Sequence, residues 1–101
     1  MILHIDTKDQ KVVRVSLKKE EKVVKSLSEE NEYGSKVLLP LIEKLLKLQK
    51  LDFKDLKGVE VEKGPGSFTG LRVGVSVANA LGFSLVIPVN GKKTETELNY
   101  Y

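Results

Sequence analysis

Short apolar runs separated by charged turns open the chain and predict three β-strands. Residues 2–6 form the first run, residues 12–17 alternate apolar with polar side chains, and residues 22–28 repeat the alternation more weakly. Such alternation is typical of strands that bury one face. The charged segments 8–11 and 18–21 are short enough to be tight turns. We therefore expect an antiparallel meander at the N-terminal end.

The pattern changes to helical spacing after residue 35. Apolar side chains recur three and four residues apart, at Val37, Leu38, Leu41, Ile42, Leu45, Leu46 and Leu48. Ser35 is a candidate N-cap, and Pro40 either starts a helix near Leu39 or kinks a longer helix that begins at Ser35. On a helical wheel, the apolar side chains of residues 37–51 cover about two-thirds of the circumference, whereas packing on a sheet needs about 100°. The excess predicts a second apolar contact, with the chain's own second helix, with a partner, or with both.

A second strand–turn–helix unit follows the connector 51–58. Residues 59–62 are expected to form a strand, the glycine-rich turn 64–70 leads into a helix over about 69–81, and Gly82 is a candidate C-cap. Residues 85–89 are apolar and predict a fifth strand that ends at Pro88 or lies at an edge. The order β-β-β-α-β-α-β predicts an α/β fold with a mixed five-stranded sheet and two main helices.

Composition limits the classes of function. The 101 residues suffice for one small domain, and 41% hydrophobic with 31% charged residues is a globular composition. The absence of cysteine excludes disulfides and thiolate metal sites, and a reducing cytoplasm is the expected compartment. No leader-like segment precedes the first strand, and we expect no membrane contact. The net charge of +3 comes from a lysine-rich surface, which favours solubility over a dedicated nucleic-acid site.

The glycine-rich turn has two physical interpretations. A turn of this kind at a helix N-terminus presents free N–H groups that suit an anion, and Ser67 or Thr69 could cap the helix. The same geometry suits a tight connection without any ligand. The turn is not a P-loop, because it carries no lysine and Leu71 follows Gly70. Thr69 occupies the third glycine position of the dinucleotide fingerprint, which excludes that motif.

Two polar residues of the first strand are further candidates. His4 is the only histidine, and between apolar neighbours we expect a packed, hydrogen-bonded side chain rather than a catalytic one. Asp6 ends the strand, where a carboxylate can hold magnesium or cap a turn; we favour the cap. One histidine and no cysteine leave no histidine-based zinc site, and we expect no metal site in the chain.

Three segments carry a family resemblance. Residues 64–74, GPGSFTGLRVG, closely resemble the signature of the bacterial TsaB (YeaZ) family. Residues 2–7, ILHIDT, and residues 38–40, LLP, resemble the start of that family's first strand and first helix. The resemblance covers about residues 1–90 and implies a ribonuclease H-like, actin-type half-domain there, followed by a polar tail over residues 91–101.

Members of that family are accessory proteins in making threonylcarbamoyladenosine at adenosine 37 of tRNAs. The resemblance implies a non-catalytic scaffold that supports a TsaD-like enzyme, with a TsaE-like ATPase joining the complex and tRNA contacted indirectly. A homodimer is implied when the chain is alone. In the family, the two helices of this half form the contact with the partner. The residues implied here are Val37, Leu38, Leu41, Ile42, Leu45, Arg72, Val73, Ser76, Val77 and Ala80.

Two departures from the family pattern bear on nucleotide chemistry. Lys8 follows Asp6-Thr7 where the family continues with serine, and the second actin-like half is not among these 101 residues. We expect no catalytic residue and no cofactor in one chain; ATP or ADP with Mg²⁺ would require an interface shared between chains. The alternative is an actin-like ATPase built from two copies, in which Asp6 holds Mg²⁺ and the turn approaches phosphate. A nuclease-like or direct tRNA-binding module is a third, weaker interpretation. The residues nearest a nucleotide would be Asp6, Thr7, Gly64, Pro65, Gly66, Ser67, Thr69 and Gly70.

Overall fold

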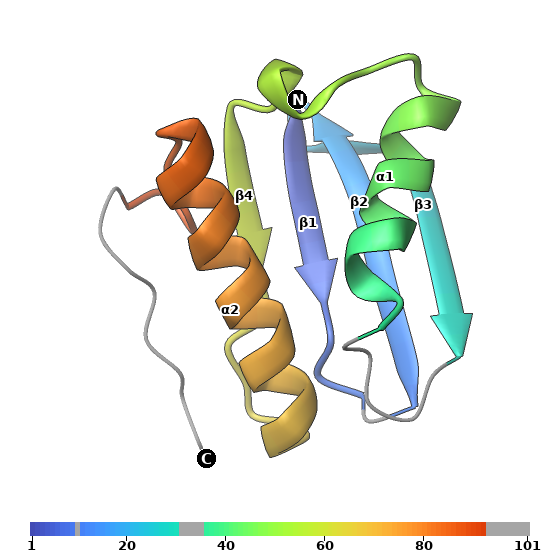
Figure 1. Cartoon of the computed structure of the whole chain (residues 1–101), viewed down its shortest axis with the longest axis vertical. Coiled ribbons are helices and arrows are strands. Elements are labelled where there is room, and N and C mark those ends of the chain that lie inside the picture. The colour runs from blue at the N-terminus through green and yellow to red at the C-terminus, as the bar shows by residue number, and fades with distance from the viewer. Residues whose placement is uncertain (10, 31–35, 93–101) are drawn as a thin grey trace.

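A mixed β-sheet forms the centre of the molecule. The computed structural model describes residues 1–9, 11–30 and 36–92. Within them the sheet has four strands, β1 (Ile2–Asp6), β2 (Val12–Lys19), β3 (Lys22–Glu30) and β4 (Gly58–Val61), in the order β3-β2-β1-β4 (Figure 1). Strands β1, β2 and β3 are antiparallel neighbours, and β4 is parallel to β1. The predicted meander is confirmed.

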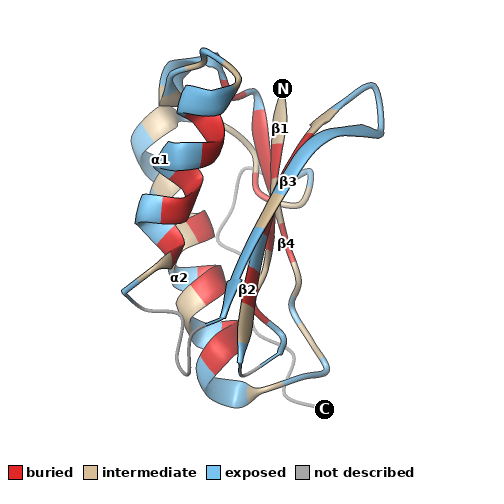
Figure 2. Cartoon of the chain, turned by 90° about the vertical axis from the view of Figure 1, so that its right-hand side faces the viewer, coloured by how far each residue is buried: buried red, intermediate tan, exposed pale blue. Residues whose placement is uncertain are grey.

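Both helices cover the same face of this sheet. Helix α1 (Leu38–Leu48) packs over β2 and β3, and helix α2 (Phe68–Leu85) packs over β4 and β1. A short 3₁₀ turn, η1 (Phe53–Asp55), lies in the connector between α1 and β4. Figure 2 shows the buried residues of both helices turned toward the sheet, and no helix of the described residues on its other face.

The core follows from the strand alternation and the register. The pairing aligns two rows of apolar side chains across three strands: Leu3 with Leu17 and Val59, and Ile5 with Val15 and Val61. All six are at most 5% exposed, and burial of such a side chain stabilises the fold by roughly 1.5–3 kcal/mol. The intervening residues of β1 and β4 point to the opposite, helix-free face of the sheet.

Helix α1 begins between the two predicted starting points. Its first residue is Leu38, so Pro40 is the third helical residue rather than the first, and no kink is needed. The first main-chain bond of the helix runs from Leu41 N–H to the carbonyl of Val37 (2.9 Å). Proline is tolerated in the first turn because N–H groups there have no helical acceptor. The candidate cap Ser35 lies outside the described residues.

The predicted end of α2 and the predicted fifth strand are both wrong. The helix continues through Gly82 to Leu85, so residues 85–89 do not form a strand. Gly82 serves close packing, not termination, because a Cβ on it would lie only 2.5 Å from Cγ2 of Val89. The C-cap is Val86, whose φ of 55° is left-handed. Residues 85–89 reach the sheet through an isolated parallel bridge between Val89 and Val59, in which Val59 N–H donates to the carbonyl of Pro88 (3.0 Å).

The side chain of Asn90 replaces the missing strand residue. Val61 N–H donates to Oδ1 of Asn90 (2.8 Å), and Nδ2 of Asn90 donates to the carbonyl of Val61 (3.1 Å). A carboxamide carries the same donor and acceptor pair as a peptide unit, so it can complete a strand edge. The boundary between residues 1–90 and the tail stays a prediction, since residues 93–101 lie outside the described part.

By length and composition alone, α2 could span a membrane. A single such helix is weak evidence, because the core helix of a soluble protein meets the same criteria. In α2, 33% of the 18 residues are buried inside the structure.

Candidate functional site

The glycine-rich turn connects β4 to α2 and is capped by a serine. Ser67 is the N-cap residue, and its Oγ accepts the N–H of Gly70 (3.4 Å). The helix therefore starts at Phe68, and Ser67 rather than Thr69 supplies the cap. A side chain that binds an early helical N–H removes one of the unpaired donors of the first turn.

Thr7 ties the start of α2 to the end of β1. Its side chain is buried, at 1% exposed, and Oγ1 donates to the carbonyl of Gly70 (2.6 Å). A Cβ on Gly70 would collide with the carbonyl oxygen of Thr7, and a Cβ on Gly74 would collide with Oγ1 of Thr7. Both glycines are required because the helix backbone lies directly against this threonine.

Lys8 fills the space in front of the turn. Ser67 N–H donates to the carbonyl of Lys8 (2.8 Å), and a Cβ on Gly66 would lie 2.7 Å from Cβ of Lys8. Asp6 accepts the N–H of Lys8 (3.1 Å), and its other oxygen lies 3.9 Å from Lys8 Nζ. Asp6 thus caps the turn that follows β1, as we favoured from the sequence.

This packing already uses two main-chain donors of the turn, the N–H groups of Ser67 and Gly70, that a phosphate could otherwise bind. The structure brings Asp6 and Thr7 beside Gly66, Ser67 and Gly70, as the nucleotide hypothesis requires. However, the N–H of Ser67 already donates to the carbonyl of Lys8, and the backbone of Lys8 lies directly against Gly66. The remaining residues of that predicted set are Gly64, Pro65 and Thr69, of which Pro65 and Thr69 are exposed. Among the described residues, no group of three or more His, Cys, Asp or Glu could hold a metal ion.

Most of the predicted partner residues of α1 lie in the chain's own core. Leu38, Leu41, Ile42 and Leu45 are at most 5% exposed, and Val37 is half-buried. These four leucine and isoleucine side chains are therefore unavailable to a partner. The wide apolar arc of α1 has a simple reason, since the helix packs over two strands and buries Leu46 as well.

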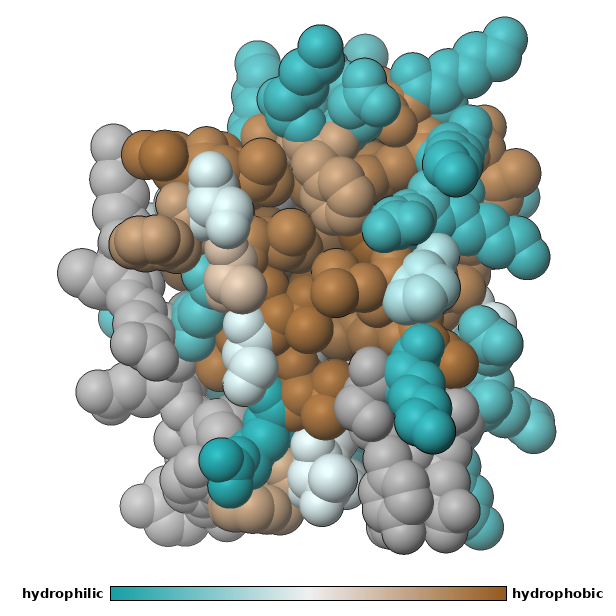
Figure 3. Space-filling view, viewed as in Figure 1, coloured by the Kyte–Doolittle hydropathy of each residue, from teal (hydrophilic) through white to brown (hydrophobic). Residues whose placement is uncertain are grey.

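Helix α2 presents the predicted partner residues at its surface. Arg72, Ser76 and Ala80 are exposed at intervals of four residues, and Val73 and Val77 are half-buried beside them. Arg72 also stacks on the ring of Phe68, with 5.5 Å between Cζ and the ring centroid. Hydrophobic side chains gather between the two helices on this side of the molecule (Figure 3).

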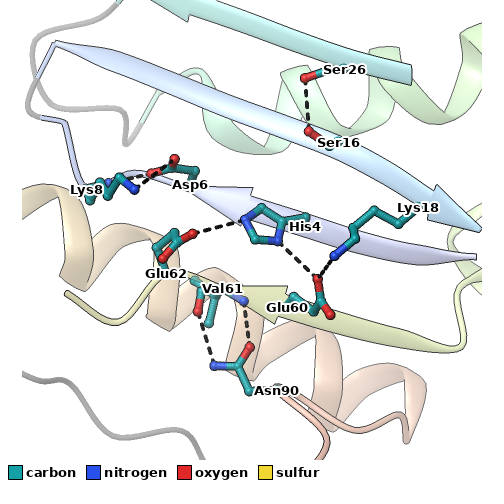
Figure 4. Close-up of polar contacts among 10 residues, drawn as sticks. All are labelled: His4, Asp6, Lys8, Ser16, Lys18, Ser26, Glu60, Val61, Glu62 and Asn90. Atoms are coloured by element: carbon teal, nitrogen blue, oxygen red, sulfur yellow. Dashed lines mark hydrogen bonds and ion pairs between the residues drawn. The ribbon is translucent and has the colours of Figure 1, made fainter. Parts of the chain in front are cut away.

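A charged cluster occupies the helix-free face of the sheet. Glu60 Oε1 lies 2.8 Å from Lys18 Nζ and 3.1 Å from His4 Nδ1, while Glu62 lies 3.4 Å from His4 Nε2 (Figure 4). The hydrogen bond from Lys18, with a smaller contribution from His4, holds the pKa of Glu60 below its usual value. The same bond to Glu60 raises the pKa of Lys18. The hydrogen-bonded state expected for His4 is confirmed.

Comparison with known proteins places this fold in a family. A family model described as TsaD, tRNA N6-adenosine threonylcarbamoyltransferase, matches residues 28–93, which is more than half of the chain. A protein of Buchnera aphidicola subsp. Schizaphis graminum, named tRNA threonylcarbamoyladenosine biosynthesis protein TsaB, is 44% identical over 97 residues. This chain belongs to the TsaB (YeaZ) family. The TsaB protein of Bacillus subtilis is 33% identical over 89 residues.

The match to TsaB is structural as well as sequential. The solved structure of YeaZ from Pseudomonas aeruginosa superposes with a TM-score of 0.79 at 30% identity and covers 87% of this chain. The four-stranded mixed sheet with two helices is thus the actin-like, ribonuclease H-like arrangement of YeaZ. The chain spans 44% of the Buchnera protein, 39% of the B. subtilis protein and 42% of the YeaZ structure.

Sequence reasoning missed two groups in this TsaB-family chain. The Lys18–Glu60–His4 contacts depend on the parallel register that places His4 beside Glu60, across 56 positions of sequence. The sequence offered no signal for this pairing, because Glu60 and His4 are brought together only by the sheet. The role of Asn90 was hidden because the residues before it were interpreted as a strand. An asparagine directly after an apolar run was the available signal.

Proposed function

We propose that this chain is a non-catalytic accessory subunit of TsaB type in the synthesis of threonylcarbamoyladenosine in tRNA. Relatives named for the biosynthesis of this modification, and a family model named for the transferase, support the proposal. The chain supports a TsaD-like transferase by binding it directly. A TsaE-like ATPase and tRNA are reached through that enzyme.

The exposed face of α2 is the structural observation on which this proposal rests. Arg72, Ser76 and Ala80 lie on one side of the helix, and the half-buried Val73 and Val77 adjoin them. Small side chains in such a row let another helix approach closely, and the valines supply apolar area beneath the contact. The arginine at the N-terminal end adds a charged group that can pair with a carboxylate of the partner.

Helix α1 also exposes apolar side chains. Leu39 and Leu48 are 45% and 52% exposed, although the other leucines and the isoleucine of α1 are buried. Nine positions separate these two leucines, so they lie on opposite flanks of the helix and at most one of them can face the α2 row. The partner surface therefore consists of the α2 row and at most one of these leucines, in place of the core residues of α1.

The glycine-rich turn acts in this proposal as a structural connection. Its contacts with Thr7 and Lys8 set the direction in which α2 leaves the sheet. ATP or ADP with Mg²⁺ would bind only at an interface shared with the partner. Calorimetry of the chain alone with ATP and Mg²⁺ should give no binding heat, and a saturable signal lost in Asp6→Asn would favour the ATPase alternative.

The test is association with the TsaD-like subunit of the same source. Ser76→Glu and Ala80→Glu each place a charged side chain in the centre of the proposed contact, where it would be desolvated without a partner. Each should weaken binding at least about tenfold in calorimetry, which corresponds to about 1.4 kcal/mol. Both positions are exposed, so the fold should persist in circular dichroism.

A matched control separates the contact from a general charge effect. Lys54→Glu changes charge in η1, at an exposed position outside both helices, and should leave the affinity unchanged. Substitution of Leu41 or Leu45 is unsuitable as a test, because both side chains belong to the core. Undiminished binding by both glutamate variants would exclude the α2 face as the interface.

A further inference from the structure

The positive net charge of this chain comes from one continuous stretch. Residues 36–57, which contain α1, η1 and their flanks, carry six lysines and three acidic residues, so their formal charge of +3 equals that of the whole chain. All six lysines are exposed, and none of them forms a salt bridge among the described residues. The charges of the other residues balance, and the excess lies on α1 and the connector that follows it.

Three of these lysines form a row over the C-terminal half of α1, here called the lysine row. Lys44 and Lys47 lie three positions apart on the helix, which makes them neighbours on its surface. Lys50 follows the end of the helix, and its N–H donates to the carbonyl of Lys47 (3.1 Å). Because the buried side of α1 is turned toward the sheet, the lysine row faces away from it (Figure 2).

A shallow hollow lies along the lysine row. Its volume is about 370 Å³, and it is lined by Pro40, Glu43, Lys44, Lys47 and Leu48. Hydrophilic side chains gather over α1, beside the hydrophobic region between the two helices (Figure 3). Two ammonium groups at one hollow attract an oxyanion such as phosphate, and the carboxylate of Glu43 opposes that attraction.

We propose that the lysine row binds the phosphate backbone of tRNA directly. The inference rests on the function proposed above, in which the transferase brings tRNA to the chain, and it adds a contact that the chain itself makes. Lysine ammonium groups bind phosphate as point charges, and each contact releases counterions from the nucleic acid. Such contacts position an RNA without reading its sequence.

The placement of α1 favours RNA over an anionic lipid surface. A helix that lies on a membrane buries its apolar side in the lipid, whereas the apolar side of α1, with Leu41 and Leu45, belongs to the core. Pro40 and Leu48 are the apolar side chains that remain in the lining of the hollow. Lipid binding scales with the apolar area that is buried, and these two residues offer little of it.

The lysine row lies beside the proposed transferase contact. Helices α1 and α2 cover the same face of the sheet, so a transferase bound on α2 and an RNA bound on the lysine row would be neighbours (Figure 1). An RNA held by both proteins gains from the second contact as an intramolecular one. A weak contact on this chain is therefore enough to strengthen the binding of tRNA to the complex.

Fluorescence anisotropy of a labelled, unmodified tRNA transcript with the full chain tests the proposal, between about 50 and 200 mM salt. We expect a dissociation constant of roughly 1–100 μM that rises with salt. Lys44→Gln and Lys47→Gln should each weaken binding about fivefold at about 100 mM salt, since each removes one counterion-releasing contact. Lys47→Arg should keep the affinity, and Glu43→Gln should increase it.

A matched control tests for a general effect of surface charge. Lys63→Gln removes the same charge at an exposed position after β4, outside the basic stretch, and should leave the affinity nearly unchanged. No binding at low salt, or equal weakening by Lys44→Gln and Lys63→Gln, overturns the proposal. Tighter binding to phosphatidylglycerol vesicles than to tRNA also overturns it and assigns the lysine row to a lipid surface.

Calorimetry with the TsaD-like subunit separates this proposal from the function on which it rests. Lys44→Gln should bind that subunit as the wild type does, because the lysine row lies outside the α2 contact. A chain that binds the transferase but no tRNA refutes the lysine row alone. A chain that binds tRNA through these lysines but no transferase refutes the proposed function and leaves the RNA contact standing.

Discussion

Replacing Val86 with glycine is expected to stabilise the protein by about 0.5–1 kcal/mol. Val86 is the C-cap of α2 and holds φ 55° and ψ 50°, a left-handed conformation that is rare for a β-branched residue. Its side chain is 85% exposed, so its removal loses little burial. The substitution therefore isolates the backbone effect from the packing effect.

The magnitude is a difference between two opposing terms. The left-handed conformation costs a residue with a Cβ roughly 1–2 kcal/mol, which glycine would recover. Glycine in turn gives the unfolded chain more freedom, which destabilises the fold by roughly 0.5–1 kcal/mol. The remainder favours glycine and corresponds to a rise in Tm of a few degrees for a domain of this size.

Urea unfolding followed by circular dichroism measures this difference. Ser84→Gly is the matched control, because Ser84 lies two positions earlier, is exposed, and is inside the helix. There the entropic term acts alone, so Ser84→Gly should destabilise by about 0.5 kcal/mol. Opposite signs at these two neighbouring positions are the expected result. A Val86→Gly variant that is no more stable than the wild type would refute the strain argument.

Three further predictions concern buried contacts and the charged cluster. Gly74→Ala should destabilise by about 2 kcal/mol or more in urea unfolding, because its methyl group would collide with Oγ1 of Thr7; the exposed Ala80→Gly control should lose no more than about 1 kcal/mol. Asn90→Ala should destabilise by about 1–3 kcal/mol, because it leaves two main-chain groups at the β4 edge without their partner, and an unchanged unfolding midpoint would contradict this role. The lowered pKa of Glu60 means that its contribution to stability is present above the unfolded value of about 4.5 and is lost as pH falls through the folded value. The stability difference between wild type and Glu60→Gln should therefore shrink between neutral pH and pH values below 4.5, and a constant difference would exclude the ionic contribution.

The local elements of this fold were predictable from neighbouring residues. Alternating apolar positions gave the three-stranded meander, helical spacing gave α1, and Ser67 was one of the two candidate caps for the start of α2. Each of these features depends on a few residues that are close in sequence. Their physical cause, one-sided burial or a capped N–H, acts within a single element.

The errors arose where tertiary contact decided the outcome. Gly82 has the chemistry of a helix terminator, but the approach of Val89 makes it a packing residue, and the helix continues past it. The apolar residues that follow were then mistaken for a strand. Leu41 and Leu45 were expected at a partner surface, yet only the position of α1 over two strands shows that they are buried. Periodicity gives the width of an apolar face but not what covers it.

Helix α2 is anchored to the sheet near both of its ends. Near the first turn, the buried hydroxyl of Thr7 binds the Gly70 carbonyl, and near the last turn Gly82 lies directly against Val89. A helix fixed at two such points cannot pivot without breaking a buried hydrogen bond or opening a packed contact. Its outer row is therefore pre-organised, and a partner that docks there orders little additional structure. Association should resemble rigid-body docking, with variants of the row acting mainly on the dissociation rate.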